Sequence, residues 1–398
     1  MPIQIGDIFG DYQVVGVLGK GGMGKVFRVR SMLTDREEAM KVVLPDMDEN
    51  PELADRFLRE IKVHARLEHP NIAALRAALR VQGRIVMIME LVPGESLDDL
   101  LRGGPLELPT AIYYVDQVLS ALEYAHAQGV VHRDIKPANI LVTGPASGQP
   151  GIVKLTDFGI AQAAGAGRLT GLGMVVGSLW YMSPEQIRSE PVDARSDIYS
   201  LGLTFYQMVT GQRPIQADSD YALLNAQLTH TPASPAEVIP GLPRPISDVV
   251  MRAMAKRPAD RFGSAQEFKM ALRASLARTP TRTAPSTDPP FAAPAGHRTA
   301  PTWPMQTAPP SWPPPAAPPA WPAPSPGAEE SRSARKPIDP AFLEKVIEWL
   351  APHMGPIAKV VVNRAAKSAQ NQAELVQALA AELPSDVERK KFVAAMRG

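Results

Sequence analysis

Three glycines near the amino terminus, Gly19, Gly21 and Gly24, are spaced so that a backbone hairpin could approach phosphate groups closely. Such a turn donates its N–H groups without side chains in the way. An ordinary glycine-rich turn and a dinucleotide-binding loop are the alternatives. The residues that follow, VFRVR at 26–30, have the pattern of a strand, whereas a dinucleotide site requires a helix there. A Walker loop is excluded because no Gly-Lys-Ser/Thr sequence follows.

A lysine between apolar residues, Lys41, lies on the next expected strand, and Glu60 lies on a helix further along the chain. Each alone could be a surface charge, at a strand edge or on a solvated helix. Together they suit phosphate chemistry, because Lys41 could neutralise the α- and β-phosphates of ATP while Glu60 fixes the ammonium group. An ion pair of this kind would also make activity depend on the position of the helix.

The segment 131–141, VHRDIKPANIL, is the most specific pattern in the chain, with a purely structural role as its alternative. Asp134 could accept or orient a substrate hydroxyl proton, and Asn139 could bind a divalent cation. Asp157, in the Asp-Phe-Gly sequence 157–159, adds a carboxylate after a short strand. These hard oxygen ligands suit Mg²⁺. The residues together indicate phosphoryl transfer, in which positioning and charge neutralisation supply nearly all of the catalysis.

The patterns around these residues predict two lobes. Up to about residue 100, short β-like runs at 12–17, 25–30, 38–43 and 84–91 are interrupted by one long helix at 52–67. Residues 100–275 have mainly helical periodicity, including helices at 110–128 and 195–210 that Gly129 and Gly211 would end. We therefore expect an α+β fold with a small β-rich lobe, a larger helical lobe and a ligand site between them.

The remaining chain differs in composition. Proline recurs at about every third residue in 279–327, so we expect 276–337 to be an extended, disordered linker. Helical patterning returns in 338–398 and predicts a small all-α bundle of three or four short helices with no recognisable catalytic motif. The linker could be a passive spacer, or it could recruit substrates or partners together with the bundle.

Composition excludes several classes of protein. Lysine plus arginine (42) nearly balances aspartate plus glutamate (41), so no overall charge favours nucleic acid or an anionic membrane. The chain has no cysteine, which excludes disulfides, thiolate nucleophiles and cysteine-ligated zinc. The sequence has neither a secretory signal nor an uncharged apolar run of about 20 residues. We expect a cytoplasmic protein without a membrane span and without a nucleic-acid partner.

With these motifs in their order, residues 10–275 resemble the eukaryotic-like protein kinases, particularly the serine/threonine kinases of bacteria. The resemblance implies a bilobal kinase fold and transfer of the γ-phosphate of ATP to serine and threonine hydroxyls of proteins. It implies a catalytic set of Asp134 as base with Lys136, Lys41 and Glu60, and a metal site at Asn139 and Asp157 for Mg²⁺, with Mn²⁺ as an alternative. It also implies an ATP site made by residues of the small lobe and the hinge, for whose apolar members ordinary core packing is the alternative: Leu18, Gly19, Gly21, Gly24, Val26, Ala39, Lys41, Met89, Glu90, Val92 and Leu141.

Other positions match structural motifs of the same family. Ser183-Pro184-Glu185 stands in place of its Ala-Pro-Glu motif, and the resemblance implies that Arg261 pairs with Glu185. Asp197 would brace the catalytic loop. Lys136 and Ser178 imply serine/threonine rather than tyrosine specificity.

Arg133, directly before Asp134, implies activation by a phosphate on the loop between Asp157 and Glu185, and Thr170 is the best acceptor there. The alternative is a loop threonine with no role. In one departure from the bacterial members, Gln162 stands where they commonly have arginine, and Arg56 could take its place.

A catalytically inactive scaffold is the alternative from a different class. Inactive members usually lose the lysine, the catalytic aspartate or the metal aspartate, and this chain has all three. The expected partners are protein substrates, a protein that binds the terminal bundle, and a second copy in a homodimer that would permit trans-autophosphorylation.

Overall fold

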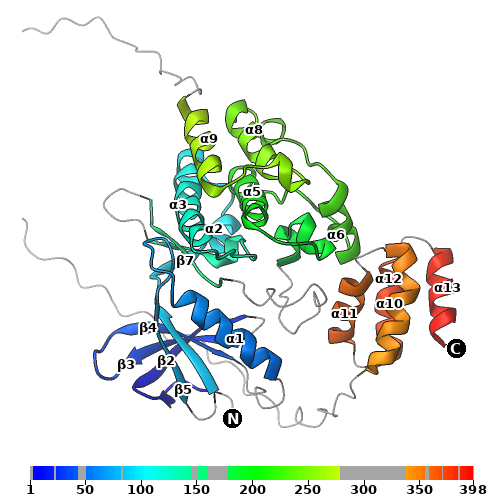
Figure 1. Cartoon of the computed structure of the whole chain (residues 1–398), viewed down its shortest axis with the longest axis horizontal. Helices are drawn as coiled ribbons and strands as arrows, with labels where there is room; N and C mark the ends of the chain where they lie inside the picture. Colours follow the sequence, from blue (N-terminus) through cyan, green and yellow to red (C-terminus); the bar gives the residue numbers. More distant parts are fainter. Residues whose placement is uncertain are drawn as a thin grey trace, which may run out of the picture. The chain divides into compact units, whose positions relative to one another are not determined.

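The computed structural model describes residues 3–21, 24–43, 51–81, 84–144, 150–158, 178–277, 338–354, 358–369, 371–383 and 386–397. A small lobe of strands with one helix is followed by a larger lobe made mainly of helices (Figure 1). The predicted two-lobed α+β fold is therefore confirmed. The expected linker lies almost wholly outside the described residues.

The small lobe is built on an antiparallel sheet in the order β1-β2-β3-β4-β6-β5. Directly opposed residues of antiparallel strands lie on the same face of a sheet. Met40 is opposite Phe27 and Ile88, and these three apolar side chains are buried together on one face. Lys41 is opposite Val26 and Met87 and therefore lies on the other face. The strands are β1 (Ile8–Phe9), β2 (Tyr12–Gly21), β3 (Gly24–Ser31), β4 (Glu37–Val43), β5 (Leu75–Val81) and β6 (Arg84–Glu90).

Helix α1 (Pro51–His64) covers the face of the sheet that carries Lys41. Its Phe57 and Ile61 are buried in one apolar cluster with Met87. The alternation of side chains along β4 thus directs a lysine toward a helix rather than toward solvent. The sequence predicted this helix to continue to Leu67, but it ends at His64.

The larger lobe is organised around α5 (Ala194–Thr210), whose residues from Ser196 to Thr210 are all buried. A helix buried on every side forms the core of a lobe. Gly202 permits close packing, because a Cβ there would lie 2.9 Å from both Ala253 Cβ and Met254 Cγ. Gly211, with φ of 71°, ends this helix, as predicted.

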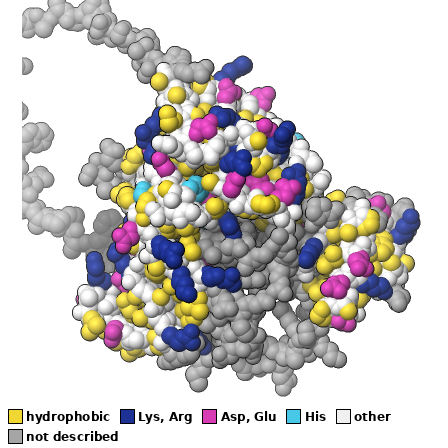
Figure 2. All heavy atoms as spheres, viewed as in Figure 1, with side chains coloured by type: hydrophobic (Ala, Val, Ile, Leu, Met, Phe, Trp, Pro, Cys, Tyr) yellow, Lys and Arg dark blue, Asp and Glu magenta, His cyan; other side chains and the backbone are white. Residues whose placement is uncertain are grey.

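Helices α3, α7, α8 and α9 pack against α5, and a small sheet of order β7-β8-β9 lies within the same lobe. Side chains of both charge signs are interspersed over the helical elements on the face that Figure 2 shows. The strands are β7 (Gly94–Ser96), β8 (Ile140–Thr143) and β9 (Val153–Leu155). The helices are α2 (Leu97–Arg102), α3 (Leu108–Ala127), α4 (Pro184–Arg188), α6 (Asp220–Thr229), α7 (Pro235–Val238), α8 (Arg244–Ala253) and α9 (Ala265–Ala277). The short 3₁₀ helices are η1 (Pro137–Asn139), η3 (Ser178–Tyr181) and η4 (Pro258–Asp260).

The C-terminal region forms a small helical bundle, as the sequence predicted. Val346, Leu350, Val362, Leu379 and Phe392 are buried in its core. None of the helices within the described ranges is long and apolar enough to cross a membrane. The bundle comprises α10 (Pro340–Met354), α11 (Ala358–Ser368), α12 (Gln372–Ala381) and α13 (Asp386–Arg397).

Candidate active site

The backbone that carries Asp134 is held by Asp197 of α5. The Asp197 carboxylate accepts the N–H of His132 at 2.8 Å and the N–H of Arg133 at 2.7 Å. Arg133 has φ of 69°, a conformation that residues other than glycine rarely adopt. The carboxylate therefore stabilises a strained turn and fixes the direction in which the next residue, Asp134, projects.

The Asp134 side chain is itself positioned by two neighbours. Lys136 Nζ donates to Asp134 Oδ2 at 2.7 Å, and Asn139 Nδ2 donates to the same oxygen at 3.0 Å. Lys136 Nζ also donates to Ser178 Oγ at 2.7 Å. Lys136 thus links the candidate base Asp134 to Ser178, which is the first residue of η3 and one of the residues that implied serine/threonine specificity.

Lys41 is the centre of a cluster of charges in which Lys41 and Glu60 are buried and Asp157 is partly exposed. Its Nζ lies 2.8 Å from Glu60 Oε1 and 2.8 Å from Asp157 Oδ1. Only 10% of the Lys41 side chain and 5% of the Glu60 side chain are exposed. Burial opposes the charged form of Lys41, but the carboxylates of Asp157 and Glu60 together hold its pKa above the ordinary value. The lysine is consequently a permanent cation at this position.

The two carboxyl groups around Lys41 respond in opposite ways. Lys41 lowers the pKa of Asp157 below its usual range, so Asp157 stays ionised. Burial raises the pKa of Glu60, and Lys41 only partly offsets this effect. A cation and an ionised carboxylate are therefore available at the same point, which suits the binding of a metal–phosphate complex.

Phe158 connects the cluster to the catalytic loop. Its ring is fully buried and lies edge-on to His64 of α1, with ring centroids 5.7 Å apart, and 4.5 Å from the ring of His132. Burial lowers the pKa of both histidines, which favours their neutral form, and the Nε2 atom of each is hydrogen-bonded to a backbone carbonyl oxygen. The sequence predicted only that His64 lies within the helix at 52–67, and no motif indicated this stack.

The two candidate metal ligands are brought together by Thr156. Its backbone N–H donates to the carbonyl oxygen of Asn139 at 2.9 Å, and Asp157 is the next residue. Because Asn139 Nδ2 donates to Asp134, the amide oxygen is the atom left to face a cation. A carboxylate and an amide oxygen are ligands of the kind that Mg²⁺ prefers, so the donor set fits a divalent cation.

Some residues expected around adenine lie on the face of the small-lobe sheet that α1 covers, and Leu141 lies on β8 of the larger lobe. Ala39 is opposite Met89, which is buried, and Val92 packs against the same cluster. Leu141 is half-buried on β8. The Glu90 carboxylate accepts hydrogen bonds from Lys154 and from the Ala74 N–H. Its side chain is therefore held by these groups, and its backbone is the part that would contact adenine.

The glycine-rich segment forms the expected hairpin. Gly19 is opposite Val26 and Gly21 is opposite Gly24 across β2 and β3, so a strand follows the glycines and the dinucleotide alternative is wrong. Leu18 is exposed on β2.

The Ala-Pro-Glu-like segment is anchored in the core by an ion pair. Arg261 donates to the two carboxylate oxygens of Glu185 at 2.7 and 2.9 Å, and its side chain is fully buried. Burial works against ionisation of Glu185, but Arg261 holds the pKa of that carboxyl below its usual value. Gln186, which the sequence did not single out, donates to the Arg133 carbonyl oxygen at 2.8 Å and joins this anchor to the catalytic loop.

Several expectations fall on residues that the structure does not describe. Thr170 and Gln162 lie in 159–177, outside the described residues, as does the side chain of Arg56. Arg133 Nε is buried and has no hydrogen-bond partner among the described residues. A buried donor of this kind is costly to leave unpaired.

Comparison with known proteins shows a clear relationship. The protein kinase domain family matches residues 12–272, and a domain of unknown function (DUF8082) matches residues 341–398. Serine/threonine-protein kinase PknJ of Mycobacterium tuberculosis is 38% identical over 276 residues, which cover 69% of this chain and 47% of PknJ. Serine/threonine-protein kinase pkn3 of Myxococcus xanthus is 40% identical over 275 residues, which cover 66% of this chain and 49% of pkn3. The chain therefore spans about half the length of these curated relatives.

A solved structure shows the same fold. The crystal structure of the Mycobacterium tuberculosis PknI kinase domain is similar with a TM-score of 0.54 and 31% sequence identity, and the similarity covers 69% of this chain and 100% of that chain.

Proposed function

Because the chain belongs to the protein kinase family, we propose that it transfers the γ-phosphate of ATP to serine and threonine hydroxyls of proteins. The observation that carries the proposal is the meeting of Lys41, Asp157, Asn139 and Asp134: Lys41 bonds Asp157, the neighbouring Thr156 bonds the Asn139 backbone, and Asn139 bonds Asp134. Phosphoryl transfer needs such an arrangement, since it depends on positioning and on charge neutralisation rather than on covalent chemistry by the protein.

Each residue has a distinct role in this proposal. Lys41 would bind ATP phosphates while Glu60 holds its ammonium group, and Asn139 with Asp157 would hold Mg²⁺. Asp134 would accept the proton of the substrate hydroxyl, with Lys136 neutralising charge beside it. When bound, Mg²⁺ supplies charge that offsets the phosphates. The hinge and hinge-facing residues Met89, Glu90 and Val92 would contact adenine.

We further propose activation by a phosphate on Thr170. The unpaired, buried Arg133 Nε supports this, because a phosphate oxygen is an acceptor of the required charge. We assign 10–275 to the catalytic domain, 276–337 to a linker and 338–398 to an accessory domain, and the cysteine-free composition supports a cytoplasmic location. A homodimer would allow one copy to phosphorylate another.

The test is incubation of the purified full chain with radiolabelled ATP and Mg²⁺, with a generic basic protein as acceptor. We expect label on the chain or the acceptor, and a loss of about 10²-fold or more in Asp134→Asn. The exposed Asp99→Asn serves as a matched control on α2 and should label as the wild type does. Equal labelling by Asp134→Asn, with an unchanged circular dichroism spectrum, would contradict the assigned role. No labelling by the wild type would favour the inactive scaffold.

A further inference from the structure

Helix α6 of the larger lobe receives a carboxylate from the C-terminal bundle at its first turn. The N–H groups at the start of a helix have no partner within the helix. Ser219 accepts one of them, from Ala222, at 3.1 Å. Glu382, the residue that caps the end of α12, accepts another, from Tyr221, at 3.2 Å. A negative charge is favourable there because the amino end of a helix carries partial positive charge.

The polar contact is accompanied by apolar packing. Leu223 and Leu224 of α6 belong to the same continuous hydrophobic cluster as Val361, Leu375 and Leu379 of the bundle. A shared cluster is the usual sign of elements that fold against one another. The bundle and α6 therefore share apolar packing as well as one hydrogen bond, in a cluster separate from the core around α5.

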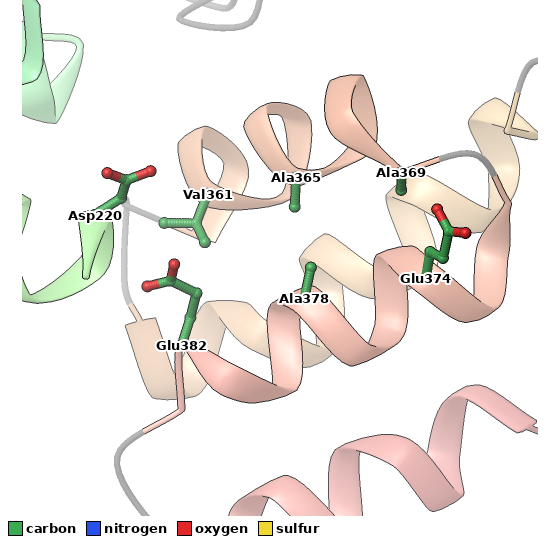
Figure 3. A pocket seen from close by; sticks show the side chains of 7 residues that line it. All are labelled: Asp220, Val361, Ala365, Ala369, Glu374, Ala378 and Glu382. Carbon is green, nitrogen blue, oxygen red and sulfur yellow. The ribbon is translucent and has the colours of Figure 1, made fainter. Parts of the chain in front are cut away.

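A cavity of about 290 Å³ lies beside this contact, between α11 and α12. Figure 3 shows Asp220 of α6 at the same end of the cavity as Val361 and Glu382, with Ala365 and Ala378 further in and Glu374 at the other end. Glu374 in the first turn of α12 and Glu382 at its C-cap thus line the same cavity, but of the two only Glu382 lies beside α6. This pair provides a matched comparison.

Near its other end, at Gln227, α6 is linked to the catalytic centre through a short series of hydrogen bonds. Gln227 of α6, which is fully buried, donates to the Trp180 carbonyl oxygen at 2.7 Å. Trp180 lies in η3, which begins at Ser178, and Ser178 is bonded through Lys136 to Asp134. Helix α6 is therefore connected, through η3 and Lys136, to the residue that would act on a substrate hydroxyl.

We propose that the bundle α10–α13 occupies the α6 face of its own chain and competes there with protein substrates. That the bundle occupies the α6 face is argued from the contacts alone, whereas its competition with protein substrates rests on the proposed kinase function. The bundle would leave short peptides unaffected, because they reach Asp134 without extending to α6. Substrate choice would then depend on whether a protein can displace the bundle.

The first experiment tests occupancy without measuring activity. Because the chain has no cysteine, two introduced thiols are the only ones present. Asp220→Cys with Glu382→Cys should cross-link within one chain when treated with a short bis-maleimide, and Asp220→Cys with Glu374→Cys should do so much less. Equal yields for the two pairs, no cross-link, or cross-links only between chains would overturn the proposal.

The second experiment tests competition, using the full-length Asp134→Asn chain as the protein substrate. In the enzyme, Glu382→Ala should lower KM for this substrate about fivefold, the effect of losing one net hydrogen bond, whereas Glu374→Ala should not. Turnover of a synthetic peptide of residues 163–177 should be equal in all three enzymes. An unchanged or raised KM in Glu382→Ala would overturn the competition. Cross-linking without any phosphorylation would instead retain the occupancy and reject the kinase assignment.

Discussion

Lys41 Nζ and Asp157 Oδ1 lie 2.8 Å apart, although 116 residues separate them along the chain. The lysine comes from a strand of the small lobe, and the aspartate follows a strand of the larger lobe. Their contact joins the two lobes at the point where phosphates and metal would bind. A bound metal–phosphate complex would replace this contact with its own, since the metal attracts the carboxylate and the phosphates attract the lysine.

Replacement of Lys41 by methionine should remove ATP-dependent labelling almost completely, by about 10²-fold or more, because a preorganised cation is lost from the site. It should also leave Glu60 buried beside Asp157 with no cation between them, so the melting temperature should fall while the circular dichroism spectrum stays that of a folded protein. Lys25→Met, on the adjacent strand β3, is the control and should keep its label. Labelling at the wild-type rate by Lys41→Met would refute the role of Lys41.

Arg261→Ala should lower the free energy of unfolding by about 3–5 kcal/mol, because it leaves the buried Glu185 carboxylate without its partner. Arg261→Lys should recover only part of this loss, since an ammonium group cannot bond both oxygens in the same plane. Arg257→Ala removes a nearby arginine that is 81% exposed and should change stability little. Urea unfolding followed by fluorescence measures all three. Similar losses for Arg257→Ala and Arg261→Ala would show that the buried pair is unimportant.

Lys256 should make stability depend on pH in the alkaline range. Burial and the nearby Arg261 lower its pKa from 10.5 to about 8, and its Nζ donates to Tyr199 Oη at 2.9 Å. Between these two pKa values the unfolded chain holds the proton that the folded chain has released, so the wild type should gain stability as pH rises through this window.

The comparison for Lys256 is made with Lys256→Met and Lys256→Arg. The stability of the wild type relative to Lys256→Met should increase from pH 8 toward the ordinary lysine value of 10.5. Lys256→Arg stays charged throughout and should show no such gain relative to Lys256→Met. A difference between wild type and Lys256→Met that does not change with pH would exclude the lowered pKa.

Thr170 should carry phosphate when the wild-type chain has been incubated with ATP and Mg²⁺, and mass spectrometry should find none there in Asp134→Asn. Thr170→Ala should lower activity toward an added protein substrate, because Arg133 would lack its anionic partner. Thr281→Ala, in the proline-rich segment, is the control for loss of a threonine as such. Full activity of Thr170→Ala would remove Thr170 from the proposal.

Short motifs predicted much of the site from the sequence. The motifs that contain Asp134 and Asp157 are each about ten residues long or shorter. Their geometry is therefore local, and the spacing of the residues in the sequence predicts it directly. The hairpin of Gly19 to Val26 and the helix that Gly211 ends were predictable for the same reason. The pairing of Lys41 with Glu60 depended instead on assuming phosphate chemistry at the site, because each residue alone fits an ordinary surface charge.

The remaining features depend on contacts that no local pattern records. The stack of His64, Phe158 and His132 joins a helix of one lobe to two loops of the other, and the contact of Glu382 with Tyr221 spans 161 residues. By contrast, strand β5 was missed although the local pattern of LRAALRV nearly alternates, with Ala78 as the one apolar residue on the exposed side.

The end of α1 was predicted too far along the chain, since apolar periodicity continues to Leu67 after the helix itself has stopped. The His64 ring lies 2.7 Å from the Ala73 carbonyl oxygen, and the chain turns soon after toward Pro70. The apolar pattern therefore predicted correctly that Leu67 is buried, but it did not predict where α1 ends.

Arg133 and Asp157 both have left-handed backbone conformations, with φ of 69° and 55°. Glycine would relieve either position, at a gain of about 1 kcal/mol or more, but it would delete the guanidinium group or the carboxylate. A screen for thermal stability would therefore select glycine substitutions at these positions that abolish the proposed kinase activity. Engineering a more stable variant of this chain must therefore keep the strained backbone at these two positions and place stabilising substitutions elsewhere.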